Sequence, residues 1–372
     1  MRIAEFAAMN IVVALGATAA VATTQSEGPS PVNYWISAET GSGLAAAAFN
    51  NISGSASVNS ALSGTGGSRR PSFAHNLSLQ LGSARRVNGT PASEHFPPAR
   101  LQVGASLPLV TPQAVRGSGA QPSASIERPR GRMLIYWGCG ERARPGQPTV
   151  VDFSSMVAGQ VPPALRNLPF TPMMPPSTAA VTTYGEWPNP RSQVRVPAGG
   201  SLIGVHTLRS NYSPEIHFTI DASQDFLAPI ALTSNRASAS GSIPLAWRSA
   251  PGARAWFAVT MGAAQNGDFV LWTSSETQAA MMVDYVPGQD LDRMVQSRVL
   301  MPSNADRCVV PAEVARAAPQ SMLSLTAFGE ESNFSQSRPA TAGSAWRPDW
   351  TVKLRRKSSY MGLLGMDMPD MG

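Results

Sequence analysis

The stretch "GSIPLAWRSAPGARAWFAVTMGAAQNGDFVLWTSS", residues 241–275, has the clearest secondary-structure pattern in this chain. Leu245 and Trp247 alternate with other residues, and after the turn "APGA" Trp256 and Phe257 begin a run that is apolar on both faces. "AQNGD" makes a second turn before the third run, "FVLWTSS". Period-two alternation between tight turns is typical of antiparallel strands. The stretch therefore predicts a three-stranded meander in a β-sandwich.

The same alternation recurs along the rest of the chain, whereas helical spacing is rare. With 32 Gly and 32 Pro among 372 residues, long helices are disfavoured, because both residue types interrupt helical hydrogen bonding. Helical spacing of apolar residues predicts one helix over 290–300, and 313–318 adds a turn or two. Further strands are predicted within residues 31–40, 74–86, 100–110, 131–140, 201–220 (two strands around a turn), 321–335 and 349–356.

These elements predict a mainly β fold of two associated β-sandwich-like units, with long irregular loops and one or two short helices. Glycine, serine and alanine dominate residues 41–71, which predicts a mobile loop, and the proline-rich run 160–200 predicts irregular backbone. The predicted division of the chain is a leader (1–22), a first strand with its loop (23–72), an N-terminal β unit (73–225), a second β-sandwich (226–358) and a flexible Met-rich tail (359–372).

The second unit resembles a fibronectin type III domain. "SIPLAWRSAPGARAWFAVTMG" is similar to the opening strands of that fold, and "SMLSLTAFGEESNFS" is similar to a late strand, so the resemblance covers parts of residues 242–335. A helix and a cysteine lie where such domains have short strands. The chain as a whole resembles an uncharacterised family of exported proteobacterial proteins. Neither resemblance implies an activity, because this sandwich carries many unrelated functions.

The first residues predict export. "MRIAEFAAMNIVVALGATAAVATTQ" places Arg2 before an apolar run that ends near Leu15, and Ala20-Val21-Ala22 fits the pattern that signal peptidase cleaves. We therefore expect cleavage after Ala22, a periplasmic or secreted mature protein, and no transmembrane span after cleavage. The alternative, a membrane anchor, requires about 20 strongly apolar residues, and this run is shorter.

The two cysteines, Cys139 and Cys308, are predicted to form a disulfide. A catalytic cysteine needs a base, and none of the four histidines lies in a recognisable cysteine-hydrolase setting. A zinc site needs three or four ligands at short spacing, and no other cysteine or histidine lies near Cys139. In an exported protein with an even number of cysteines, pairing is the simplest expectation.

Sequence motifs for catalysis are missing. The chain contains no G-x-S-x-G elbow, H-E-x-x-H zinc pair, phosphate loop or dinucleotide fingerprint. Carboxylate pairs have no fixed spacing, so Asp221 with Asp225, or Glu330 with Glu331, remain candidates for acid catalysis or calcium binding. The alternative is that these residues belong to ordinary turns at strand ends.

The segment "TYGEWPNP" offers a candidate ligand-binding pair, Tyr184 and Trp187. Aromatic rings on a rigid loop bind sugars or peptides well, since little side-chain entropy is lost on contact. The alternative is that Trp187 packs downward as an anchor of the loop.

The C-terminal stretch "KLRRKSSYMGLLGMDMPDMG", residues 353–372, raises two further possibilities. The thioethers of Met366, Met368 and Met371 are soft donors of the kind that binds Cu(I), although a frayed tail without function is the alternative. The four cations within 353–357 are a docking patch for anionic envelope components or the solvated edge of the last strand.

The function expected from these features is an exported, noncatalytic cell-envelope or extracellular binding or scaffold protein. Its candidate partners are an envelope polysaccharide or protein. We expect no cofactor, because the chain contains no phosphate loop or dinucleotide fingerprint. We expect no nucleic-acid partner, because a net charge of +6 is moderate for 372 residues. The alternatives are an exported hydrolase acting on polysaccharide or peptide through a carboxylate site and, more weakly, a copper-sampling Met-rich tail.

Overall fold

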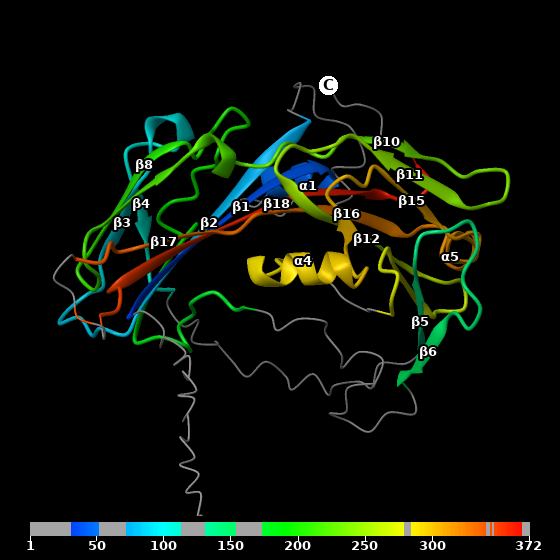
Figure 1. Ribbon diagram of the computed structural model, residues 1–372, viewed down its shortest axis with the longest axis horizontal. Coiled ribbons are helices and arrows are strands. Elements are labelled where there is room, and N and C mark those ends of the chain that lie inside the picture. Colours follow the sequence, from blue (N-terminus) through cyan, green and yellow to red (C-terminus); the bar gives the residue numbers. More distant parts are fainter. Residues whose placement is uncertain are drawn as a thin grey trace, which may run out of the picture.

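The computed structural model of this chain describes residues 31–51, 72–112, 131–153, 173–278, 284–339, 343 and 346–366. Strands dominate these residues, which confirms the mainly β prediction (Figure 1). The predicted leader, residues 1–22, lies outside the described residues. No helix in the described ranges is long and apolar enough to cross a membrane.

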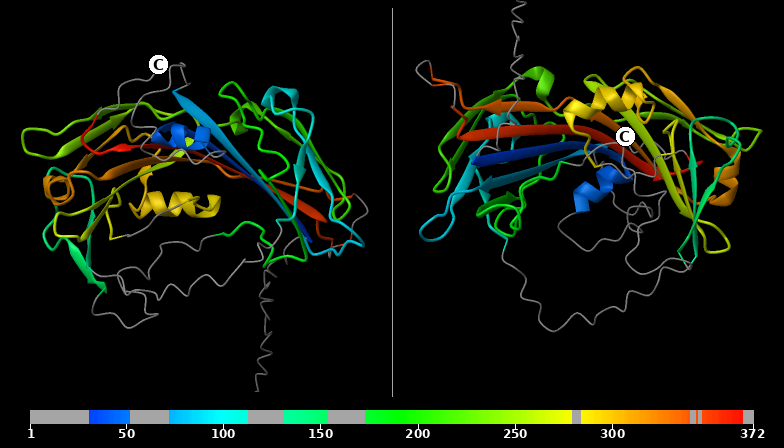
Figure 2. Two further views of the ribbon diagram at one scale, coloured as in Figure 1. Left: turned by 180° about the vertical axis from the view of Figure 1, so that it is seen from behind. Right: turned by 60° about the horizontal axis from the view of Figure 1, so that its bottom comes forward.

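Eleven of the described strands form one large sheet, with the main order β6-β5-β13-β12-β16-β18-β1-β2-β7. β14 pairs with β12, and β17 pairs with β18. The sheet curves across the whole width of the molecule (Figure 2). Its strands are β1 (Val32–Gly43), β2 (Phe73–Ser83), β5 (Arg132–Trp137), β6 (Thr149–Asp152), β7 (Thr183–Trp187), β12 (Ala253–Ala263), β13 (Phe269–Thr273), β14 (Met301–Pro302), β16 (Met322–Gly329), β17 (Ser332–Ser335) and β18 (Trp350–Leu363).

Two smaller sheets and a few short helices cover this large sheet. The smaller sheets have the orders β4-β3-β8-β9 and β10-β11-β15 and lie toward opposite ends of the molecule (Figure 1). Their strands are β3 (Ser93–Phe96), β4 (Leu107–Leu109), β8 (Gly204–Ser210), β9 (Ile216–Ile220), β10 (Leu232–Asn235), β11 (Ile243–Trp247) and β15 (Arg307–Val310). The helices are α1 (Leu44–Asn51), α4 (Gly288–Gln296) and α5 (Ala312–Ala317), with 3-10 turns η1 (Ala99–Leu101) and η3 (Ala222–Gln224).

β18 contributes to the hydrophobic cores beneath both smaller sheets. Val352 and Leu354 pack in the core under the four-stranded sheet, and Tyr360 packs in the core under the three-stranded sheet. These residues have the same parity in one strand, so they lie on the same face of the large sheet. Both smaller sheets therefore cover that face, while α4 packs on the opposite face, against residues such as Phe257 of β12.

The predicted meander of residues 241–275 is wrong in one respect. β12 pairs with β13 as expected, but β11 pairs with β10 and β15 in the facing three-stranded sheet. The turn around Gly252 therefore carries the chain from one sheet to the other. Alternation identifies strands but not their partners, because an apolar face is buried equally well by stacking across a sandwich. The resemblance to a fibronectin type III domain stays a prediction.

The division at residues 225 and 226 falls where the chain crosses between the two smaller sheets. Strands from both sides of this division share the large sheet: β5, from the N-terminal part, pairs in parallel with β13. β1 likewise pairs in parallel with β18 over 12 residues, from Val32↔Trp350 to Gly43↔Met361. The two halves of the sequence are therefore joined through a continuous network of backbone hydrogen bonds.

Three predicted irregular segments contain regular structure. α1 lies in the predicted loop 41–71, because the run "LAAAAF" is rich in the best helix former. β7 lies in the predicted irregular run 160–200, since five residues of that run pair with β2. β18 extends to Leu363, so the first part of the predicted flexible tail is a strand paired on both sides.

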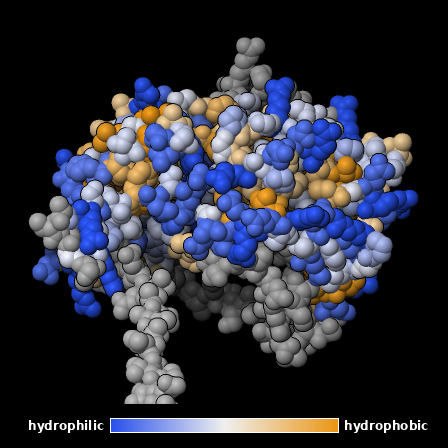
Figure 3. All heavy atoms as spheres, viewed as in Figure 1, coloured by the Kyte–Doolittle hydropathy of each residue, from blue (hydrophilic) through white to orange (hydrophobic). Residues whose placement is uncertain are grey.

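Hydrophilic and hydrophobic side chains are mixed on the face of the molecule that Figure 3 shows. Hydrophilic residues cover most of this face, and hydrophobic residues lie among them in separate patches (Figure 3). The large exposed apolar side chains belong to scattered positions, such as Met174, Val194 and Val205. Isolated apolar residues of this kind are ordinary on protein surfaces.

Candidate functional site

The structure buries the aromatic pair of "TYGEWPNP". Tyr184 is 5% exposed and Trp187 is 2% exposed, so neither ring presents an open face to solvent. The Tyr184 hydroxyl donates to Glu186 Oε2 at 2.7 Å, and the Trp187 indole N–H donates to Ser192 Oγ at 3.0 Å. Burial raises the pKa of Tyr184 well above its ordinary value. Both rings are therefore packed inside the protein, as in the alternative interpretation of Trp187.

Trp187 nevertheless forms part of the wall of a cavity of about 230 Å³. Its lining residues are Phe49 of α1, residues 75–77 of β2, and residues 187–190 and 193–196. We call this space the β2 cavity. It combines apolar walls with a few polar groups, which is the usual make-up of a ligand site.

The β2 cavity exists because β7 is shorter than β2. β7 pairs with β2 only over Leu79–Ser83, although β2 begins at Phe73. Beyond Trp187 the chain contains Pro188 and Pro190, which have no N–H to continue the ladder. A short bridge between Asn189 and Ser192 then turns the chain, and residues 193–196 also line the cavity.

His75 is the titratable group of β2 that lines this cavity. Its ring stacks on Phe226 with centroids 4.0 Å apart, and its Nδ1 lies 3.1 Å from the Thr40 hydroxyl. Burial lowers the pKa of His75, while the Ala198 carbonyl and the charge of Asp225 oppose this effect. His75 is therefore a neutral, oriented polar group at neutral pH.

Two other histidines lie in the core and cannot meet a ligand. His95 and His206 are 0% and 1% exposed. Tyr34 Oη lies 3.0 Å from His95 Nδ1, His95 Nε2 lies 3.1 Å from His206 Nδ1, and His206 Nε2 lies 2.7 Å from the Leu202 carbonyl oxygen. Burial lowers the pKa of His206 to about 4 and that of His95 well below its ordinary value. This chain of hydrogen bonds holds the four-stranded sheet to β1.

The basic cluster near residue 355 is neither a docking patch nor the edge of a strand. β18 is central in the sheet, with β1 on one side and β16 and β17 on the other. Lys353 forms an ion pair with Glu331, in which both side chains are nearly buried. Lys357 forms ion pairs with Glu39, at 3.4 Å, and with Asp284. Both sequence-based interpretations of this cluster are therefore wrong.

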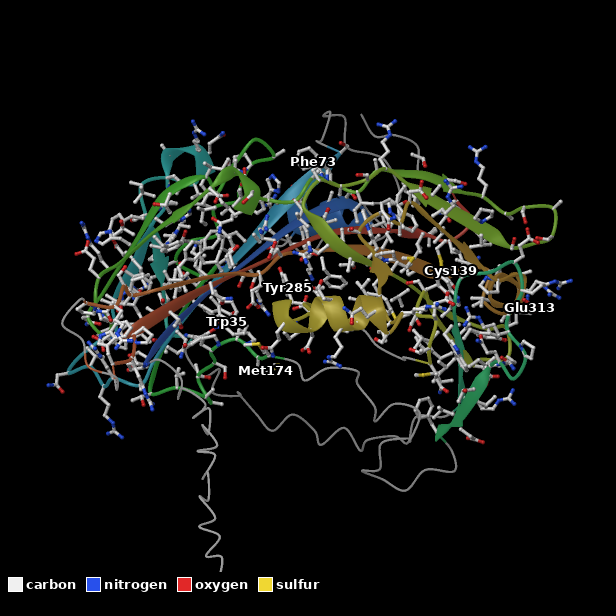
Figure 4. All side chains as sticks on the ribbon, in the orientation of Figure 1. Trp35, Phe73, Cys139, Met174, Tyr285 and Glu313 are labelled. Atoms are coloured by element: carbon white, nitrogen blue, oxygen red, sulfur yellow. A yellow bond between two sulfur atoms is a disulfide. The ribbon has the colours of Figure 1, made fainter. Side chains whose placement is uncertain are left out.

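Arg355 has a different environment from its lysine neighbours. Its guanidinium lies 4.7 Å from the ring centroid of Trp35 and 4.2 Å from that of Tyr285, and it donates to Ser37 Oγ at 2.7 Å. Figure 4 shows Trp35 and Tyr285 beside the large sheet, on the side where α4 lies. These cation–π interactions hold Tyr285, in the segment that leads into α4, close to β1 and β18.

The carboxylates considered for catalysis have structural partners. Asp225 accepts hydrogen bonds from the Ser201 hydroxyl and the Leu202 backbone N–H, both at 2.7 Å. Asp221 caps η3 through Ser223. Glu331 pairs with Lys353, as described above, and Glu330 pairs with Arg254 at 3.1 Å. The turn interpretation therefore describes these residues better than a catalytic pair does.

The proposed copper ligands fall largely outside the described residues. Met366 is 52% exposed at the end of the described chain, and Met368 and Met371 lie beyond it. Within the described ranges, no three histidine, cysteine, aspartate or glutamate side chains are grouped to hold a metal ion.

The predicted disulfide between Cys139 and Cys308 is confirmed, with Cα atoms 5.3 Å apart. Cys139, labelled in Figure 4, follows β5 of the large sheet, and Cys308 lies in β15 of the three-stranded sheet. The bond therefore joins the two layers of one sandwich. The adjacent backbone is also joined, since the Gly140 N–H donates to the Val309 carbonyl at 2.9 Å.

Sequence reasoning misses most of the residues around the β2 cavity. Composition predicts a loop at Phe49, and alternation identifies His75 only as a residue of a strand. The usable signal is Pro188 with Pro190 shortly after Trp187, where β7 ends, while β2 continues back to Phe73. No protein-family model matches this chain, and neither a curated protein nor a solved structure shows detectable similarity to it.

Proposed function

We propose that this chain is an exported, noncatalytic binding protein of the cell envelope or extracellular space, and that its ligand occupies the β2 cavity. The observation that carries the proposal is the cavity itself, with a volume of about 230 Å³ between β2 and residues 187–196. An engineered apolar cavity of roughly 150 Å³ accepts benzene. The β2 cavity is therefore large enough for one aromatic ring or one branched aliphatic group.

The chemistry of the walls favours binding over turnover. Phe49, Leu77, Trp187 and Val196 supply apolar surface, while His75 is held in a fixed orientation by its stacking on Phe226. A general acid or base works best with a pKa near the working pH. Burial moves the pKa of His75 below its ordinary value, so this imidazole serves better as a neutral hydrogen-bonding group.

Export is supported by the signal-peptide pattern and by the disulfide. Disulfides persist mainly in oxidising compartments such as the periplasm and the extracellular space. The hydrolase and the copper-binding tail have no supporting observation of their own within the described residues. Fractionation of the source cells tests the compartment, and recovery of the protein with cytosolic markers overturns export.

A pair of variants tests the β2 cavity as the binding site. Val194 lines the cavity and is 47% exposed, so V194W narrows the cavity without disturbing the core. Val205 lies on β8, outside the cavity, and is 60% exposed, so V205W is the matched control. The probes are a defined set of envelope oligosaccharides and blocked peptides, and binding is measured by thermal shift and calorimetry.

We expect at least one probe to bind the wild type and V205W alike, and to bind V194W at least tenfold more weakly. Mass spectrometry of the recovered probe tests the noncatalytic part of the proposal, and a cleaved probe overturns it. Equal affinity of wild type and V194W for every bound probe, or no binding by any probe, overturns the assignment of the cavity.

A further inference from the structure

The backbone of β2 has an open edge beside the β2 cavity. The Ala84 N–H donates to the Pro31 carbonyl at 2.8 Å, directly beyond the Val32↔Ser83 pair of the β1–β2 ladder. In an antiparallel ladder, residues alternate between bonding to one neighbour and to the other. Even-numbered residues of β2 therefore bond to β1, and odd-numbered residues direct their N–H and C=O groups toward the opposite edge.

β7 occupies that opposite edge only from Leu79 onward. His75 and Leu77 direct their backbone groups into the space that β7 leaves, and no described segment forms a strand there. An N–H or C=O group without a partner at a sheet edge is a template for another strand. The cavity lies at this position, because residues 75–77 are part of its wall.

The cavity walls come from both faces of the large sheet. Leu77 and Trp187 belong to the core beneath the four-stranded sheet. Phe49 approaches from the other face, because its ring lies against Gly41, whose parity in β1 is opposite to that of the core residues. An extended peptide directs successive side chains to opposite faces of a sheet. A strand in this position would therefore contact both sets of walls.

We infer that the ligand of the β2 cavity is an extended peptide segment that adds a strand to the open edge of β2, in line with β7. Backbone hydrogen bonds to His75 and Leu77 would supply affinity, and the apolar walls would select a large aliphatic or aromatic side chain. This inference rests on the proposed function and names its ligand class.

Other occupants fit the site less well. A polysaccharide ligand is usually held by an open aromatic face, and the rings of Tyr184 and Trp187 are buried. A second copy of the chain would have to bring the edge of a folded sheet against β2. Residues 193–196 also line this space, and its volume of about 230 Å³ leaves less room for the edge of a folded sheet than for a single peptide segment.

The test uses the full chain and a library of blocked heptapeptides in which threonine alternates with Val, Leu, Phe or Tyr. The tightest binder is then made in two N-methylated forms, one methylated at its second and fourth residues and the other at its third and fifth. In a bound strand only one of these sets directs its N–H groups toward β2. We expect one form to lose at least roughly tenfold in affinity and the other to bind almost unchanged.

Amide hydrogen exchange gives an independent measurement at the edge. On peptide binding, the amides of His75 and Leu77 should exchange more slowly, whereas the amide of Asn76, already directed to β1, should not change. V194W should weaken peptide binding at least tenfold, and V205W should not. Sedimentation of the protein with and without peptide reports any pairing of two copies.

The outcomes separate this inference from the proposed function. Equal effects of the two N-methylated forms, together with unchanged exchange at His75 and Leu77, overturn strand addition even if V194W still weakens binding. Binding of oligosaccharides but not peptides in the β2 cavity, or dimers formed through this edge, also overturns it and leaves the binding function in place. Failure of every probe to bind overturns both.

Discussion

His95 and His206 form a hydrogen-bonded polar pair in the described core of this protein. The His206 Nε2–H donates to the Leu202 carbonyl, so His206 Nδ1 accepts from His95 Nε2–H. His95 Nδ1 must then accept from the Tyr34 hydroxyl. One direction of donation satisfies all three bonds, and both imidazoles are neutral in this arrangement. A proton added to either ring reverses the donation, so that the Tyr34 hydroxyl oxygen must accept from His95 Nδ1–H, and it places a charge in the buried core.

The buried histidine pair makes the free energy of unfolding depend on pH. The pKa of His206 falls from 6.5 in the unfolded chain to about 4 in the folded protein, because burial disfavours the charged ring. The contribution of His206 to stability is therefore fully present above pH 6.5 and is lost as the pH falls toward 4. His206 alone accounts for a loss of roughly 3 kcal/mol over this range. Urea unfolding at a series of pH values measures this loss.

The control variants separate the histidine pair from general acid effects. H206Q retains a donor and an acceptor but does not titrate, so we expect a flatter dependence of unfolding free energy on pH than in the wild type. H217Q, at an exposed position on β9, should reproduce the wild-type dependence. Parallel curves for wild type and H206Q would contradict the assignment.

Arg356 is a buried charged residue that holds separate backbone segments together. Its side chain donates to the carbonyl oxygens of Ser223, Asp225 and Glu330 at 2.7, 3.0 and 3.2 Å. Ser223 and Asp225 belong to the segment that crosses from the four-stranded to the three-stranded sheet. A buried guanidinium with several acceptors fixes backbone well, since it offers five donors in a rigid plane. Arg356 therefore anchors the crossing segment to β18.

Among the elements, α1 depends on a glycine in the strand before it. Gly41 lies in β1, and a Cβ at this position would overlap the ring of Phe49 in α1. The absence of a side chain at Gly41 allows the helix to pack directly on the strand. The position of Phe49 in the wall of the β2 cavity follows from this close contact.

We expect G41A to displace α1 and destabilise the protein by about 1–3 kcal/mol, because the added methyl overpacks the contact with Phe49. Amide exchange of residues 44–51 should become faster, and urea unfolding should occur at lower concentration. A Cβ at Gly343 would have no described atom within 4 Å, so G343A is the control and should change neither measurement. Unchanged protection of α1 in G41A would contradict this packing argument.

Across the whole molecule, β18 and the disulfide connect parts that are distant in sequence. β18 contributes side chains to both cores, and the bond between Cys139 and Cys308 spans 169 residues. A cross-link over a long loop reduces the conformational entropy of the unfolded chain. The large sheet and the disulfide therefore act together on the stability of the whole protein.

Removing the cross-link should lower the unfolding free energy. In the chain-entropy model the C139A/C308A double variant loses up to about 5 kcal/mol, because its unfolded state gains freedom over a long loop. Thermal and urea unfolding, with and without reductant, measure the loss. Reductant should destabilise the wild type and leave the double variant unchanged. Equal sensitivity of the two proteins to reductant would contradict the prediction.

Local sequence patterns were enough to identify most of the strands and the disulfide. Alternation is a relation between near neighbours, so β1, β2, β5, β8, β9, β12 and β16 could be predicted from short windows of sequence. The pairing of Cys139 with Cys308 followed from an even cysteine count and a signal-peptide pattern. Compositional bias was a poorer guide, because the alanine run that forms α1 is surrounded by glycine and serine residues typical of loops.

The neighbours of each strand and the place of the cavity depend on contacts between distant parts of the chain. The central place of β18 and the burial of its cations rest on pairing with β1, more than three hundred residues earlier in the chain. The β2 cavity is formed by α1, β2 and the segment after β7, and no local pattern relates these three. Pairing is settled when distant apolar faces are buried together, and that free energy belongs to the assembled sheets.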